Sequence, residues 1–229
     1  MQADATSQER AAVDELLGAP QSAWDGAAER TVLDHRVARS GAAARDDRHL
    51  LLPALHALQG AVGWISPGGM NYACERLSVP PAEAYGVATF YAMLAVEPRP
   101  ARVVDVCEDI ACKCVGSDDL IAQIEERFGG EGELSDDGSA TWYRSPCLGQ
   151  CDRAPAALVS DAGDEPHERT LALTTAAAVL DVLAGGDPGP APVTVLPQAG
   201  DPSLRLLSRA ASDRSVSLDE YRAQGGYAA

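Results

Sequence analysis

Between residues 48 and 98, apolar positions recur every three or four residues, as they do along one face of a helix. The clearest apolar face consists of Leu51, Leu55, Leu58 and Val62. Gly63 is placed to end this helix. A Pro-Gly-Gly turn at 67–69 then precedes a second helix over 70–77, and a third follows the proline pair at 80–81. The pattern therefore predicts a helical bundle over 48–98.

The pattern changes after residue 101, where short β-branched runs alternate with helical ones. Strands are predicted over 102–106, 142–145, 157–160 and 170–173. Helices are predicted over 117–128 and 175–183, the first opened by Ser117 as an N-cap. This order of elements over 101–185 favours an α/β fold in which helices pack on a small mixed sheet.

The two ends of the chain carry less pattern. Residues 1–47 are rich in Ala, Arg and Asp, with a helical patch at 11–17 that Gly18-Ala-Pro20 interrupts. We expect a leader there that is partly helical or flexible. Residues 186–229 open with a proline-rich linker and carry a short apolar patch at 193–196. We expect this segment to be a linker followed by a tail.

Charge and hydropathy narrow the class of partner. The net charge of −16 disfavours nucleic acid or an anionic membrane surface. It leaves two interpretations open, a solvated acidic surface or a surface that meets a basic partner. No apolar run is long enough to span a bilayer, and residues 1–17 lack the features of a secretory signal. We therefore expect a cytoplasmic protein without direct membrane insertion, in which thiols stay reduced.

Five of the six cysteines lie between residues 107 and 151, in two groups. Cys107 and Cys112 have four residues between them, and Cys114 follows closely. Cys147 and Cys151 have three residues between them. Each group lies where a predicted strand gives way to a loop. A [2Fe–2S] cluster needs four thiolates, two per iron, and two pairs from two loops meet this requirement. Cys114 is either a spare thiol or a competitor of Cys112.

Other sites were weighed against a cluster. Structural zinc also takes four thiolates, and the two spacings lie at the edge of its usual range. A thioredoxin-type dithiol needs Cys-x-x-Cys, which the chain lacks, and the histidines a Rieske centre needs are found outside both groups, at 35, 49, 56 and 167. Unrelated thiols remain the simplest alternative, and Cys74 lies in a helical apolar pattern typical of a packed core thiol. No phosphate-binding loop or catalytic triad stands out, so we expect no catalytic residues here.

Several stretches carry a family resemblance that covers about residues 48–185. They read Leu51-Leu-Pro-Ala-Leu-His-Ala-Leu-Gln59, Gly63-Trp-Ile65, Val79-Pro-Pro-Ala-Glu-Ala-Tyr-Gly-Val-Ala-Thr-Phe-Tyr91, Val106-Cys-Glu-Asp-Ile-Ala-Cys112 and Ser145-Pro-Cys-Leu-Gly-Gln-Cys-Asp-Arg-Ala-Pro155. The sequence resembles the family of the 24-kDa subunit, or E subunit, of NADH:quinone oxidoreductase, respiratory complex I. That family includes the related subunits of NAD-dependent formate dehydrogenases and NAD-linked nickel–iron hydrogenases.

The resemblance implies a thioredoxin-like domain over 101–185, preceded by a helical bundle and binding one [2Fe–2S] cluster. The family's four ligands correspond to Cys107, Cys112, Cys147 and Cys151, which favours Cys112 over Cys114. Gly116 and Gly149 are places where backbone N–H groups could approach the cluster sulfurs.

The resemblance also implies a function and partners. The chain would transfer electrons, as a non-catalytic subunit of an oxidoreductase complex. It would dock on a flavoprotein that binds FMN and NAD(H), with further iron–sulfur or catalytic subunits, in the cytoplasm or at the cytoplasmic face of the inner membrane. The alternative function is a zinc-stabilised interaction module. Residues 204–229 depart from the family and resemble the opening of the flavoprotein, either as a partner-binding extension or as the remnant of a fused pair.

Overall fold

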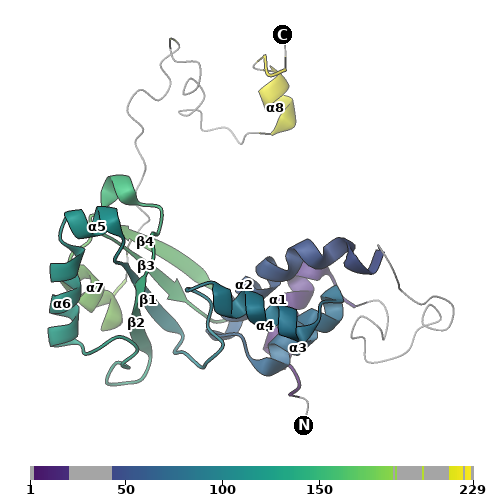
Figure 1. Cartoon of the computed structure of the whole chain (residues 1–229), viewed down its shortest axis with the longest axis horizontal. Coiled ribbons are helices and arrows are strands. Elements are labelled where there is room, and N and C mark those ends of the chain that lie inside the picture. Colours follow the sequence, from purple (N-terminus) through teal and green to yellow (C-terminus); the bar gives the residue numbers. More distant parts are fainter. Residues whose placement is uncertain are drawn as a thin grey trace. The chain divides into compact units, whose positions relative to one another are not determined.

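The computed structural model describes residues 3–20, 43–187, 189, 203, 217–223 and 225–227 (Figure 1). The chain divides into two units, 1–191 and 192–229. In the second unit the structure describes helix α8 (Leu218–Ala223), where the rings of Tyr221 and Tyr227 meet edge to face at 5.0 Å. The apolar patch predicted at 193–196 and residues 204–216 of the tail lie outside the described residues.

The first unit opens with helices that share one apolar core. In chain order they are α1 (Ser7–Leu17), the 3₁₀ helix η2 (Ala43–Leu50), α2 (Leu51–Val62), α3 (Pro67–Leu77) and α4 (Pro81–Phe90). Leu51, Leu55 and Leu58 are buried in this core, which confirms the apolar face predicted for α2. Ala61 is also buried, whereas Val62 lies at the edge of the face and is partly exposed.

Helix α1 begins at Ser7, four residues before the patch predicted from hydrophobicity at 11–17. A capping box explains the earlier start: the N–H of Glu9 donates to the Thr6 hydroxyl at 3.2 Å, and the N–H of Thr6 donates to the Glu9 carboxylate at 2.7 Å. Val13 is fully buried against the other helices. Gly18 caps the end of α1 with a φ of +76°, as its position in the sequence predicts.

The turn predicted at 67–69 is wrong, because these residues form the first turn of α3. Ser66 caps the helix, accepting a 2.9 Å hydrogen bond from the N–H of Gly69, and Pro67 takes the position where no N–H is needed. The glycines are required by close packing. A Cβ on Gly68 would lie 2.3 Å from the carbonyl oxygen of Asp4. The N-terminal segment therefore packs directly on the backbone of α3.

The second part of this unit is a four-stranded mixed sheet, as predicted. Its strands are β1 (Arg102–Cys107), β2 (Ala140–Ser145), β3 (Ala156–Asp161) and β4 (His167–Ala172). Their order is β2-β1-β3-β4, with β1 and β2 parallel and the other two pairs antiparallel.

Helices α6 (Ser117–Arg127) and α7 (Ala176–Leu183) cover one face of the sheet (Figure 1). Val104, Val106 and Trp142 face this side and are buried with the helices in one apolar cluster. Ser117 is not the N-cap that the sequence suggests. Gly116 takes that position with a φ of +96°, and the buried Ser117 hydroxyl has no hydrogen-bond partner in the described chain.

The bundle and the sheet are joined by hydrogen bonds. The N–H of Gly163, in the turn after β3, donates to the carbonyl oxygen of Gly60 on α2 at 3.0 Å. The Gln8 side chain donates to the carbonyl oxygen of Ala61 at 3.0 Å and to Asp164 at 3.3 Å. Among the described helices, none combines the length and the apolar character that crossing a bilayer requires.

Candidate metal centre

The two cysteine segments leave the sheet from neighbouring strands. Cys107 ends β1 and is paired in register with Ser145, which ends β2. Because these strands are parallel, both of their carboxyl ends lie at the same edge of the sheet. Cys147 follows Ser145 by two residues. The two cysteine segments, far apart in sequence, therefore leave the sheet at adjacent positions.

A short helix that the sequence analysis did not predict, α5 (Ile110–Cys114), orients the next two cysteines. The Asp109 side chain caps it, accepting a hydrogen bond of 2.6 Å from the N–H of Ile110. Cys112 points inward and is only 2% exposed, whereas Cys114 is exposed. The helix is too short to show a hydrophobic period, and the only sequence signal for it is Asp109 as a capping residue.

The second cysteine segment brings Cys147 and Cys151 together. Their sulfur atoms lie 3.3 Å apart, with Cys151 opening the short 3₁₀ helix η3 (Cys151–Arg153). Between them, Gly149 has a φ of +75° and donates its N–H to the sulfur of Cys147 at 3.4 Å. The N–H donor expected at Gly149 is thus present, and the glycine is needed for its backbone conformation, since a Cβ there would meet nothing within 4 Å.

All four cysteines that the resemblance implies as ligands line one cavity of about 350 Å³. The other residues that line it are Asp109, Ile110, Ala111, Gln150 and Ala156. Neither Cys114 nor Gly116 lines this cavity, and Cys74 is buried in the helical bundle. The structure therefore brings together the two predicted cysteine pairs and leaves Cys114 outside.

The surroundings of the cysteines disfavour free thiolates. The pKa of Cys112 is raised to about 11, chiefly by burial and then by the adjacent Cys107, with the N–H of Ala156 acting in the opposite direction. The pKa of Cys151 is raised by its hydrogen bond with Cys147 and by the charge of that group. Without a cation these thiols remain protonated at neutral pH. A bound metal would displace the protons, because thiolates are stabilised by its positive charge.

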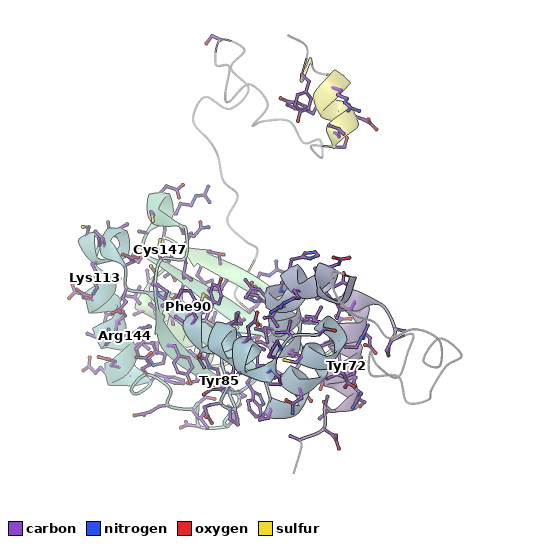
Figure 2. All side chains as sticks on the ribbon, turned by 45° about the vertical axis from the view of Figure 1, so that its right-hand side comes forward. Tyr72, Tyr85, Phe90, Lys113, Arg144 and Cys147 are labelled. Atoms are coloured by element: carbon purple, nitrogen blue, oxygen red, sulfur yellow. The ribbon has the colours of Figure 1, made fainter. Side chains whose placement is uncertain are left out.

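Charged side chains link the two segments beside the cavity. Arg144, on β2, lies 2.7 Å from Glu125 and 3.5 Å from Glu108, which follows Cys107. Lys113, on α5, lies 3.8 Å from the same Glu108. Figure 2 shows Lys113, Arg144 and Cys147 on the sheet part of the molecule, away from Tyr72 in the helical part. These contacts help to hold α5 against the end of β2.

The donor set fits a [2Fe–2S] cluster, which takes four thiolates, two on each iron. Cys147 and Cys151 form one close pair, and Cys107 is the hydrogen-bond neighbour of Cys112 in the other. In the described part of the chain, no three His, Cys, Asp or Glu side chains are close enough together to hold one metal ion. His49, His56 and His167 do not line the cavity, and His35 lies outside the described residues.

Comparison with known proteins identifies the family. Residues 37–183 match the thioredoxin-like [2Fe–2S] ferredoxin family. The E subunit of the NADH-quinone oxidoreductase of Pseudomonas aeruginosa is 31% identical over 134 residues, which are 58% of this chain and 78% of that protein. Subunit 2 of the Thermus thermophilus enzyme is 31% identical over 61% of this chain and 76% of its own length.

Other matches are partial. The E subunit of the Mycobacterium tuberculosis enzyme is 34% identical over half of this chain and 46% of its own. A solved structure of an NAD⁺-reducing [NiFe]-hydrogenase aligns with 59% of this chain and 22% of its own, at 21% identity and a TM-score of 0.46. With the family match covering most of the chain, and the sheet, bundle and cysteine cavity in place, this chain belongs to the thioredoxin-like [2Fe–2S] ferredoxin family.

Proposed function

We propose that this chain is the electron-transfer subunit of an NAD(H)-linked oxidoreductase complex and carries one [2Fe–2S] cluster. Its ligands are Cys107, Cys112, Cys147 and Cys151. The observation that carries the proposal is the cavity that these four cysteines line together, while the fifth nearby thiol stays outside. Family membership and the names of the relatives, subunits of NADH-quinone oxidoreductases, support it.

The cysteines and nearby backbone N–H groups would have different roles in holding such a cluster. Cys107 and Cys112 are each 2% exposed and supply the buried pair, whereas Cys147 and Cys151 supply the exposed pair. The N–H groups of Gly149 and Ala156 donate to the sulfurs of Cys147 and Cys112. Such hydrogen bonds stabilise the added negative charge and so raise the reduction potential. A [2Fe–2S] cluster supplies one-electron transfer.

The exposed pair marks the side from which electrons enter or leave. Ile110 lines the same cavity and is 77% exposed, so an apolar side chain stands in solvent beside the exposed cysteines. Burial of such an apolar side chain under a partner protein stabilises the complex. NADH delivers a hydride and a single cluster takes one electron, so the partner we propose is a flavoprotein that holds FMN and the NAD(H) site.

Purification of the chain under oxygen-free conditions tests the cluster. We expect a visible chromophore that bleaches with dithionite, together with two irons and two acid-labile sulfides per chain. A colourless protein that contains stoichiometric zinc would instead establish the alternative function, a zinc-stabilised interaction module.

Affinity purification from the native cell tests the complex. We expect an FMN-containing subunit to be recovered with the chain, and the further subunits to decide between a complex I, a formate dehydrogenase and a hydrogenase. Recovery of a cluster-bearing chain without any flavoprotein would contradict the proposed partner and leave the cluster assignment intact.

A further inference from the structure

Asp105 is a buried carboxylic acid that no described side chain contacts through a hydrogen bond or an ion pair. It lies in the middle of β1 and is only 5% exposed. Within the described chain, its side chain accepts no hydrogen bond and forms no ion pair. Its neighbours in sheet register are Tyr143 and Leu158, neither of which satisfies it. A buried carboxyl group without a partner is destabilising, so its place in the central strand calls for a functional reason.

The side chain faces a cavity of about 610 Å³ on the sheet face opposite α6 and α7. Strand residues Val103, Asp105 and Leu158 form one wall, and Ala57 and Gly60 of α2 form another. None of the four proposed cluster ligands lines this cavity. Its volume lies within the range of about 300–1,000 Å³ that is usual for ligand sites, which often form where two parts of a fold meet.

Several other polar groups around the cavity already have partners. Asp161 pairs with Arg102 at 2.6 Å and with His167 at 3.2 Å. The guanidinium of Arg99 stacks over the ring of Tyr143 at 4.3 Å. The two carboxyl groups that remain, Asp105 and Glu168, form no hydrogen bond or ion pair with any described residue. Arg99 also lines the cavity, and its positive charge attracts Asp105 from beyond ion-pair distance. Asp105 and Glu168 are thus acceptors that no described donor contacts directly.

We propose that this cavity binds a small organic cation, an ammonium, amidinium or guanidinium group on an apolar body. The cationic group donates to Asp105, and the apolar body packs against Ala57, Met93 and Leu158. A charge-assisted hydrogen bond of this kind satisfies the buried carboxylate. The net charge of −16 further favours cations near the protein. This site is separate from the cysteine cavity and does not depend on the proposed electron transfer.

Calorimetric titration of the full, cluster-loaded chain with benzamidinium tests the proposal, with neutral benzamide as the isosteric comparison. We expect saturable binding at one site, about tenfold or more tighter for the cation than for the amide. Asp105→Asn preserves shape and removes the charge, and it should weaken benzamidinium binding about tenfold or more. Asp136→Asn is the matched control, because Asp136 is an exposed acid outside the cavity. The affinity of this variant for benzamidinium should be unchanged.

A second variant keeps the test decisive if Asp105→Asn does not fold. Ala57→Phe fills the cavity from the partly exposed surface of α2 and leaves Asp105 in place. It should abolish benzamidinium binding without changing the visible spectrum of the cluster. Three results would each overturn the proposal: no saturable binding, equal affinity for benzamide, or unchanged benzamidinium affinity in both cavity variants.

Discussion

The backbone N–H of Glu108 donates a hydrogen bond to the carbonyl oxygen of Ser145, with the two atoms 3.0 Å apart. This bond extends the parallel pairing of β1 and β2 one residue beyond Cys107. Both cysteine segments therefore leave the sheet side by side, although a helix and a long connection separate them in the chain. The proposed metal centre depends on this pairing.

Replacing one exposed ligand should remove the cluster. We expect Cys147→Ser to abolish the [2Fe–2S] absorption or to shift it strongly, because a serine hydroxyl is a poor substitute for a thiolate on iron. Cys74→Ser is the matched control, since Cys74 lies in the core of the helical bundle. The measurements are visible absorption and the electron paramagnetic resonance of the reduced protein. An unaltered spectrum in Cys147→Ser would show that this residue is not a ligand.

Serine substitutions at Cys112 and Cys114 should have different effects on the cluster. Cys112 lines the cavity and Cys114 does not. We therefore expect Cys112→Ser to lose or strongly shift the cluster signal and Cys114→Ser to keep it, with iron and sulfide contents that follow the spectra. The reverse result would mean that α5 turns in the loaded protein to present Cys114.

Two helical glycines should respond in opposite ways to alanine. In Gly68→Ala, the new methyl group would meet the Asp4 backbone at 2.3 Å. We expect the free energy of unfolding to fall by about 2 kcal/mol, because overpacking forces the N-terminal segment away from α3. Gly86→Ala, on the exposed side of α4 with nothing within 4 Å, should be neutral or stabilising by up to about 1 kcal/mol. Urea unfolding measures both, and equal losses would show that the N-terminal segment does not pack on α3.

The two cysteines outside the centre should differ in reactivity. Burial raises the pKa of Cys74 to about 11, with a smaller contribution from Glu83. At about pH 8 only about one Cys74 side chain in a thousand is then a thiolate, the reactive form. We expect iodoacetamide to modify the exposed Cys114 of the cluster-loaded protein quickly and Cys74 slowly, with Cys74 gaining reactivity as the pH rises toward 11. Peptide mass spectrometry measures the two rates, and similar rates would contradict the burial of Cys74.

The local pattern of apolar and polar residues was sufficient to predict most of the helices and strands. The apolar face of α2 and all four strands were predictable because periodicity and β-branched runs act over a few residues. The errors have other causes. Gly68 and Gly69 suggest a turn by composition, yet their small size allows close packing, of Gly68 against Asp4 and of Gly69 against Leu58 and Glu9, which the local pattern does not reveal. Ser117 has the chemistry of an N-cap, but it is already the first residue of α6, and the position before the helix is taken by Gly116 in the left-handed conformation.

By itself the sequence determined that five cysteines lie in two groups, each just after a predicted strand, because spacing and residue type are properties of the chain. Only the tertiary structure decided which thiols share a cavity. Parallel pairing of β1 and β2 sets Cys107 beside the start of the second loop, and the turn of α5 points Cys112 inward and Cys114 outward. The burial of Asp105 was likewise decided by strand register and by α2, through contacts between residues distant in sequence.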